Sequence, residues 1–215
     1  MSQARPPRVV FDFGAVLFRW RPAHVVRTVW PHRARTEAEL AQTVADCFQA
    51  YGGDWGAFDQ GLIDEQVLAE RMQARMGWPA AEVLALVAAI DAELQVQPEV
   101  LALLLELKAA GHRLSYLSNM PTVLSRGLLA RNPLPAWFES GVFSCNVHLI
   151  KPDPALFALA AQSFGEQPAD CLLNDDHPAN IEAARAGGWQ AELFTTPALL
   201  AEALKARGLL GASGR

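Results

Sequence analysis

The segment VVFDFG, residues 9–14, places an aspartate and a glycine directly after a short apolar run. Such a run of β-branched and aromatic side chains, without a polar break, is typical of a buried β-strand. The strand is predicted to end at Asp12, because Gly14 follows at once and is a turn signal. We therefore expect the Asp12 carboxylate to lie at the carboxyl end of a buried strand.

From residue 113 onward the chain alternates between strand and helix patterns. Prolines stand near the predicted helix starts and glycines near several of the helix ends. This alternation predicts an α/β fold, with a Rossmann-like parallel sheet and helices on both of its faces. The predicted strands are Arg113–Leu117, Gly141–Cys145, Asp170–Leu173 and Gln190–Phe194, and the predicted helices are Pro121–Arg131, Pro152–Gly165, Pro178–Gly187 and Pro197–Arg207.

A long helical stretch separates the first strand from the second. Roughly ninety residues lie between Phe18 and Leu114, whereas a crossover between parallel strands needs only about a dozen or a little more. Helix patterns occur at Ala23–Trp30, Thr36–Ala50, Asp64–Met76, Ala80–Leu94 and Pro98–Ala110. The last of them can serve as the crossover helix. The others are expected to form an inserted all-helical cap domain at residues 19–94, within an α/β core formed by residues 1–18 and 95–215.

The composition is that of a folded, acidic protein. Hydrophobic residues make up 51% of the 215 residues and charged residues 19%, which excludes intrinsic disorder. The formal net charge is −5 and there is no block of Lys and Arg, so nucleic-acid binding is not expected. The uncharged runs fall short of the ~18 apolar residues that a membrane span requires.

The cysteines and the first residues bear on the cellular compartment. Cys47, Cys145 and Cys171 are odd in number and widely spaced, which favours buried thiols over a disulfide framework or a zinc site. Residues 1–8 are polar and lack the apolar segment of a secretory signal. We expect a cytoplasmic protein, either a monomer or a homodimer, with no membrane partner and a frayed end at residues 211–214.

Polar side chains follow several of the predicted strands. Ligands of an open parallel sheet bind at the carboxyl ends of its strands, so these residues are expected to converge. Carboxylates can hold Mg²⁺, Lys and Ser can screen a phosphate, and a carboxylate can also attack phosphorus. The set therefore favours phosphoryl transfer. Its members are Asp12, Ser118, Asn119, Lys151, Asn174, Asp175 and Asp176.

Four segments in the same order resemble the motifs of the haloacid-dehalogenase-like hydrolase superfamily, in the subgroup with an inserted helical cap. They are residues 9–17, 116–119, 151–157 and 172–180. Each motif alone is a weak signal, but the ordered set is specific and covers nearly the whole chain. The resemblance implies a Rossmann-like core, a Mg²⁺ cofactor and a small phosphorylated metabolite as the partner.

The resemblance also implies roles for individual residues. Asp12 would be the catalytic nucleophile and, with Asp175 and the backbone carbonyl of Gly14, a metal ligand. Ser118 and Lys151 would be catalytic and, with Asn119, would bind phosphate. Asp176 and Asn180 would lie around these groups, in contact with the residues that bind the metal and the phosphate, and would hold them in place.

Gly14 departs from the commoner family pattern. Most phosphatases of the superfamily have a second Asp two residues after the nucleophile, which protonates the leaving group. General acid–base catalysis of this kind contributes about 10²–10⁴ in rate. Sugar-1-phosphate phosphatases that resemble this chain also have Gly there. The superfamily's dehalogenases lack the second Asp too, but they need no metal, and the pair Asp175–Asp176 would then have no role.

Each of these residues has a structural alternative. Asp12 could cap a turn, Ser118 and Asn119 could cap the helix after Pro121, and Lys151 could be a solvated surface residue. The further candidates stay open between a role in the site and a role in packing. Asp176 and Asn180 could order a loop, and His148 and His177 could replace the missing acid. The last set lies where the insert is expected to contact the core: Arg19, Trp20, Trp55 and Phe58.

The function expected from this sequence is that of a Mg²⁺-dependent phosphatase. It would hydrolyse a small phosphate monoester, with sugar phosphates among the candidates, through an aspartyl-phosphate intermediate. One alternative is a protein that binds a phosphorylated ligand and has lost turnover. Another is a metal-independent 2-haloacid dehalogenase.

Overall fold

The computed structural model describes residues 5–211, so the expectations for the first four residues and for residues 212–214 lie outside the described part. Its core is a five-stranded sheet in the order β3-β2-β1-β4-β5. Every adjacent pair of strands is parallel, which confirms the predicted fold class. The strands are β1 Arg8–Phe11, β2 Leu114–Ser118, β3 Ser140–Phe143, β4 Cys171–Asp175 and β5 Gln190–Leu193.

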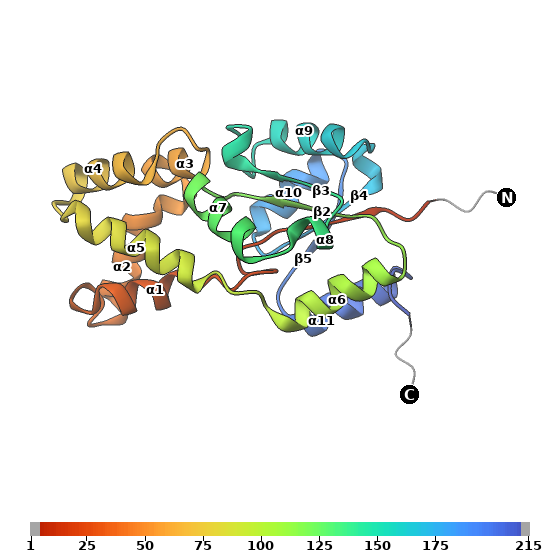
Figure 1. The fold of residues 1–215 in the computed structure, drawn as a ribbon, viewed down its shortest axis with the longest axis horizontal. Helices are drawn as coiled ribbons and strands as arrows, with labels where there is room; N and C mark the ends of the chain where they lie inside the picture. The colour runs from red at the N-terminus through yellow and green to blue at the C-terminus, as the bar shows by residue number, and fades with distance from the viewer. Residues whose placement is uncertain (1–4, 212–215) are drawn as a thin grey trace.

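Helices cover both faces of this sheet (Figure 1). Successive strand residues point to opposite faces, so Val9 and Phe11 pack into one hydrophobic cluster and Val10 into the other. Helices α9 and α10 cover the Val10 face, while α6, α7, α8 and α11 contribute to the cluster on the other face. Their bounds are α6 Pro98–Ala109, α7 Thr122–Arg131, α8 Leu134–Trp137, α9 Pro154–Phe164, α10 Pro178–Ala186 and α11 Pro197–Ala206.

Four predicted element boundaries are wrong by two residues. The helix predicted to end at Ala50 ends at Phe48, and the strand predicted to end at Cys145 ends at Phe143. The strand predicted to end at Leu173 continues to Asp175, because that residue still pairs with Leu193 of the edge strand β5. The helix predicted to start at Pro152 starts at Pro154, because the Asp153 side chain caps it by accepting a hydrogen bond from the Ala155 amide (2.8 Å). A proline at N1 leaves no unpaired amide there.

The segment between β1 and α6 is helical, as predicted, and lies to one side of the sheet (Figure 1). Its apolar faces pack on one another and on the core in a single cluster. The sequence did not predict α3, which is short and lies between Gly53 and Gly61, both at positive φ. Glycines so placed are typical of loops. The helices are α1 Pro22–Val29, α2 Glu37–Phe48, α3 Gly53–Asp59, α4 Glu65–Met76 and α5 Ala80–Glu93.

The chain enters and leaves the insert through two connectors that run side by side. Phe18 and Val96 form an antiparallel bridge. The Arg19 amide donates to the Gln95 carbonyl (2.8 Å), and the Gln97 amide donates to the Leu17 carbonyl (2.8 Å). The division predicted at residues 18 and 95 falls within these connectors. Whether the insert is a separate domain stays a prediction.

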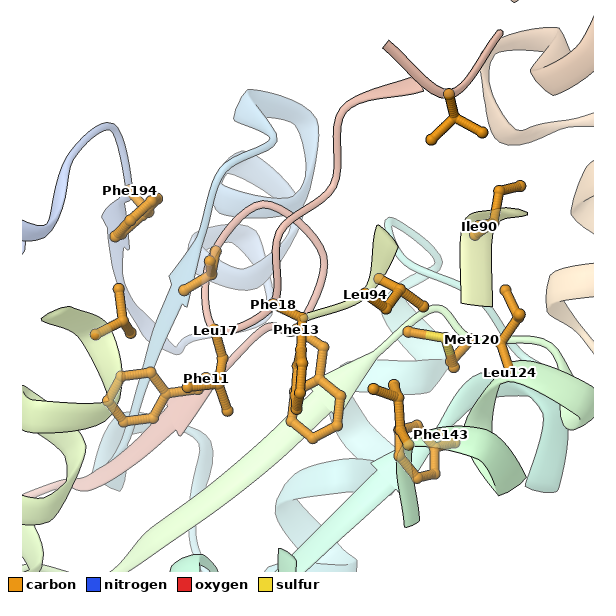
Figure 2. Packing of buried hydrophobic residues seen from close by; sticks show 14 of the residues in the cluster. Phe11, Phe13, Leu17, Phe18, Ile90, Leu94, Met120, Leu124, Phe143 and Phe194 are labelled. Atoms are coloured by element: carbon orange, nitrogen blue, oxygen red, sulfur yellow. The ribbon is translucent and has the colours of Figure 1, made fainter. Parts of the chain in front are cut away.

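The insert packs directly against the core. Figure 2 shows Ile90 and Leu94, at the end of α5, facing Met120 and Leu124, which lie after β2. All four side chains are buried in the same cluster. No helix among residues 5–211 is long and apolar enough to cross a membrane. The three cysteines are free and buried, as predicted.

Candidate active site

A pocket lies where the helical insert meets the carboxyl ends of the strands. Its space is about 1000 Å³, including the open mouth. The core contributes Asp12, Gly14, Asn119, Met120, Lys151, Asp176, His177 and Asn180, and the insert contributes Trp20, Tyr51, Trp55, Asp59 and Ile90, among others. The structure therefore brings most of the predicted site residues to one cavity. Ser118 and Asp175 are fully buried next to it and do not line it.

The floor of the pocket is an ion-pair network centred on Lys151. The Lys151 ammonium lies 2.9 Å from Oδ1 of Asp12 and 2.5 Å from Oδ2 of Asp175. The sheet positions both carboxylates, because Phe11 pairs with Asn174 of β4 and the Asp12 amide donates to the Asn174 carbonyl (2.9 Å). All three charged side chains are buried. The surface alternative for Lys151 is therefore wrong.

Burial and charge act in opposite directions on this network. Burial raises the pKa of Asp12 to about 7, Lys151 opposes the rise, and Asp175 adds to it. Burial alone lowers the pKa of Lys151, but the carboxylates of Asp12 and Asp175 outweigh it and raise that pKa. Lys151 is therefore held as an ammonium. A single ammonium faces two buried carboxylates, so the floor keeps a net negative charge when both are ionised and would attract a further cation.

Asp175 is held on every side. Its Oδ1 accepts hydrogen bonds from the Asn180 side chain (2.9 Å) and from the His177 amide (2.9 Å). Asn180 thus orders the loop after β4 and also lines the pocket. Asp176 is exposed, and burial and the neighbouring Asp175 raise its pKa.

Three carboxylates could hold a metal ion here. Oxygen atoms of Asp12, Asp175 and Asp176 lie within 4.8 Å of one another. Hard carboxylate oxygens, with room for water and a substrate oxygen, are the ligands that Mg²⁺ prefers. The donor set therefore fits the predicted cofactor.

Asn119 and Ser118 differ in how free their side chains are. The side-chain amide of Asn119 makes two hydrogen bonds to the Lys151 backbone. Its Oδ1 accepts from the Lys151 N–H (2.8 Å), and its Nδ2 donates to the Lys151 carbonyl (3.0 Å). Asn119 therefore positions Lys151. The Ser118 hydroxyl makes only a long contact to the Asn119 carbonyl (3.5 Å), so it remains available as a donor.

Gly14 lines the pocket without filling it. Its backbone is not in the left-handed region. A Cβ added there would lie 3.7 Å from Trp20, an ordinary van der Waals distance. Glycine is therefore not required at this position by strain or by crowding, and the missing carboxylate is a chemical feature of the site.

The upper wall of the pocket is apolar and aromatic. Trp20 donates from its indole N–H to the Tyr51 hydroxyl (3.3 Å) and packs edge-on against Phe48. Trp55 packs against Phe48 too. Of the candidates from the insert, Trp20 and Trp55 line the pocket. Phe58 is not a lining residue and is 1% exposed, in the hydrophobic core.

Asp59 is the one carboxylate of the pocket lining that sequence analysis missed. It is the last residue of α3, it is 4% exposed, and it lines the same pocket as Asp12. Burial raises the pKa of Asp59 to about 8, and the charge of Asp12 adds to the rise. No motif marks this residue, because its place depends on how the insert packs on the core. The sequence signal was a carboxylate directly after Phe58 in a glycine-rich stretch.

The other sequence candidates lie at the rim or outside. His177 lines the pocket and is exposed, with its ring 6.3 Å from that of Tyr51. His148 is outside the lining, and its Nδ1 hydrogen-bonds the Gln60 carbonyl (2.8 Å). Arg19 is also outside, 3.6 Å from Glu93.

A parallel sheet with polar and charged side chains at the ends of its strands is an arrangement typical of ligand-binding α/β proteins. A family model for haloacid dehalogenase-like hydrolases matches residues 8–188. The chain belongs to this family. The predicted resemblance and the predicted hydrolase class are thereby confirmed.

Three curated relatives are all named as phosphatases. Over 203 residues, 94% of this chain and 95% of the relative, the chain is 25% identical to the sesquiterpene phosphatase astK of Aspergillus oryzae. It is 37% identical over 70 residues to the fructose-1-phosphate phosphatase YqaB of Escherichia coli, a match that covers 33% of this chain and 37% of that relative. It is 34% identical over 95 residues to the phosphoserine phosphatase of Thermus thermophilus, covering 44% of this chain and 38% of that relative.

Solved structures share the fold at low identity. A family enzyme of Bacteroides thetaiotaomicron, in complex with magnesium and inorganic phosphate, has a TM-score of 0.71 at 19% identity, covering 89% of this chain and 95% of that chain. The L-2-haloacid dehalogenase of Xanthobacter autotrophicus has a TM-score of 0.65 at 19% identity, covering 96% and 85%. A family enzyme solved with magnesium and phosphate and a haloacid dehalogenase thus share this architecture, so the fold does not decide the reaction and the site must.

Proposed function

We propose that the protein is a Mg²⁺-dependent phosphomonoesterase that uses Asp12 as its nucleophile. The observation that carries this is the pocket floor, where Lys151 bridges Asp12 and Asp175 and the carboxylates of Asp12, Asp175 and Asp176 cluster. A floor with several carboxylates suits a phosphate only together with a metal ion. The names of the curated relatives support the same reaction class.

Each residue of the floor has a defined task in this proposal. An Asp12 oxygen attacks phosphorus and forms an aspartyl-phosphate while the ester oxygen leaves. Lys151 and the Ser118 hydroxyl stabilise the charge on the phosphoryl oxygens. Asn119 holds the Lys151 backbone in place. Asp12, Asp175, Asp176 and the Gly14 carbonyl would hold Mg²⁺, which supplies positive charge against the phosphate oxygens.

The pocket wall favours a substrate with an apolar organic group. Trp20, Trp55, Ile90 and Leu94 line the space above the floor. Binding a sugar would bury several hydroxyls, and each of them needs a polar partner. The full-length likeness to a sesquiterpene phosphatase supports an apolar alcohol. The shorter match to a fructose-1-phosphate phosphatase supports a sugar phosphate, which stays the second candidate.

A phosphate-release panel tests the function. We expect phosphate release from aryl and terpenyl monophosphates in Mg²⁺, loss of activity in EDTA, and recovery when Mg²⁺ is returned. Asp12→Asn should fold and show no turnover. Release that persists in EDTA, or normal activity of the Asp12→Asn protein, would contradict the proposal. A matched set of sugar phosphates decides between the two substrate classes.

The two alternative functions give different outcomes in the same assay. A protein that only binds phosphorylated ligands would bind panel members and release no phosphate. A dehalogenase would release halide from a 2-haloacid without added metal. The acidic floor argues against a dehalogenase. A haloacid substrate carries a carboxylate, which would be repelled by Asp12, Asp175 and Asp176, and Lys151 offers a single positive charge against these three.

A further inference from the structure

We propose that Asp59, at the end of α3, donates the proton to the leaving oxygen and so supplies the acid that is absent at Gly14. This inference rests on the proposed phosphomonoesterase function. An alcohol leaves a phosphate poorly as an alkoxide, so the reaction needs a proton donor beside the ester oxygen. Gly14 has no side chain to provide it, whereas Asp59, from the helical insert, lines the same pocket.

The position of Asp59 is fixed from the core. The Ser144 hydroxyl, just after β3, donates to the Asp59 carbonyl (2.5 Å) and accepts from the Met120 amide (2.8 Å). One buried side chain thus ties the end of α3 to the loop that follows β2. The insert therefore brings this carboxyl to the site in a defined place, as a proton donor requires.

The Asp59 carboxyl is not engaged elsewhere. Within residues 5–211 it has no hydrogen bond and no ion pair, although the residue is 4% exposed. Asp54, on the same helix, is by contrast 3.0 Å from the Arg75 guanidinium. A largely buried carboxyl that lines a cavity and has no protein partner is a candidate for a functional group. It is in the pocket, and it has a proton to give.

Its surroundings keep that proton in place near neutral pH. Burial in the apolar wall raises the pKa of Asp59 to about 8, and the charge of Asp12 adds to this while Lys151 opposes it. Tyr51, Asp176 and His177 are the other titratable groups that line the pocket. The acid form of Asp59 also avoids repelling an anionic substrate.

The two histidines fit this role less well. His177 is exposed at the rim. His148 is outside the pocket lining, and one of its ring nitrogens is taken up by the Gln60 carbonyl. Asp59 is the buried carboxyl of the lining that is not part of the acidic floor.

The proposed proton transfers balance over one cycle. As Asp12 bonds to phosphorus and the ester P–O bond breaks, the leaving oxygen takes the Asp59 proton and departs as the alcohol. A water molecule then attacks the aspartyl-phosphate, its proton passes to the Asp59 carboxylate, and the bond between phosphorus and Asp12 breaks. Inorganic phosphate leaves, and Asp12 and Asp59 are restored.

The test compares two substrates of nearly equal shape. The p-nitrobenzyl phosphate leaving group is a basic alkoxide, whereas that of p-nitrophenyl phosphate is a weakly basic phenolate. In single-turnover experiments at saturating Mg²⁺, Asp59→Asn should slow release of the benzyl alcohol by about 10²–10⁴-fold. Release of nitrophenol should change far less. Asp54→Asn is the matched control on the same helix and should leave both rates unchanged.

The pH profile gives a second readout. Wild-type cleavage of p-nitrobenzyl phosphate should fall as the pH rises through about 8, because the proton on Asp59 is lost there. In Asp59→Asn this limb should disappear. Asp59→Ala, checked by thermal melting, serves as the second variant without the acid.

The possible outcomes separate the inference from the function on which it rests. Equal slowing of both substrates by Asp59→Asn and Asp59→Ala, or no slowing of either, overturns the role of Asp59 while the phosphatase function stands. A wild-type protein that cleaves neither substrate in Mg²⁺, and no member of the wider panel, overturns both.

Discussion

Gly14 is the residue at which this chain departs from the commoner pattern of its family, and our proposal assigns the missing proton donor to Asp59. The backbone at Gly14 is unstrained and a Cβ there would be 3.7 Å from Trp20. The position therefore accepts a Cβ, the first atom of the aspartate that most phosphatases of the family have there. If Asp59 supplies the acid instead, the two positions should substitute for each other.

A rescue experiment tests this exchange. Gly14→Asp in the Asp59→Asn background should restore single-turnover cleavage of p-nitrobenzyl phosphate by about tenfold or more, because a carboxyl is again available beside the leaving oxygen. The added charge lies near Asp12, so the rates are compared at saturating Mg²⁺ with folding checked by circular dichroism. A well-folded double variant that stays as slow as Asp59→Asn would count against the exchange.

The residues near motifs were predictable, and those that depend on packing were not. Asp12, Lys151 and Asp175 could be placed together because the ends of parallel strands meet at one edge. The side-chain pairing of Asn119 with the Lys151 backbone could not be foreseen, because the sequence does not reveal which loop its amide contacts. Asp59 was missed for a similar reason, since it belongs to a different segment of the chain.

At the scale of elements, the contact between α3 and the core determines where the insert places the Asp59 carboxyl in the pocket. Ser144 bonds both to the Asp59 carbonyl and to the Met120 amide in a buried place. Ser144→Ala should lower the free energy of unfolding by about 1–3 kcal/mol, because two buried polar groups lose their partner. The substitution should also slow the cleavage of p-nitrobenzyl phosphate more than that of p-nitrophenyl phosphate, because the end of α3 no longer holds Asp59 in position.

Denaturant unfolding and the two single-turnover rates measure these effects. Ser163→Ala is the control, since that hydroxyl donates to a carbonyl of its own helix on the exposed surface. A Ser144→Ala protein that is as stable as wild type, with an unchanged ratio of the two rates, would mean that this contact does not position Asp59.

Most helices and strands could be predicted from the local sequence pattern, and the exceptions depend on contacts with other parts of the chain. Helices α10 and α11, which have a proline in the first turn, begin at the predicted residue, whereas α9, which has one too, begins two residues later than predicted. Helix α3 was not predicted, because it begins at Gly53 and is followed by Gly61, both at positive φ, and its burial comes from tertiary packing. The end of β4 was set by pairing with β5, which the strand's own sequence does not encode.

At the scale of the whole molecule, the insert and the sheet form one pocket from two chemically different halves. The sheet contributes a charged floor and the insert an apolar wall with one carboxyl. The alternation of strands and helices predicted the floor. The wall could not be predicted, because it depends on how α3 and α5 pack against the core. Figure 2 shows this packing for Ile90 of α5, which faces Leu124.

The central claim is that Asp12 carries the phosphoryl group during turnover. Rapid acid quench of the wild-type protein during cleavage of p-nitrophenyl phosphate in Mg²⁺, followed by mass spectrometry of its peptides, tests it directly. The account predicts one added phosphoryl group on the peptide that contains Asp12, absent in EDTA and in Asp12→Asn. Steady phosphate release with no phosphoryl group on Asp12 at any quench time, or a phosphoryl group on another residue, would contradict it.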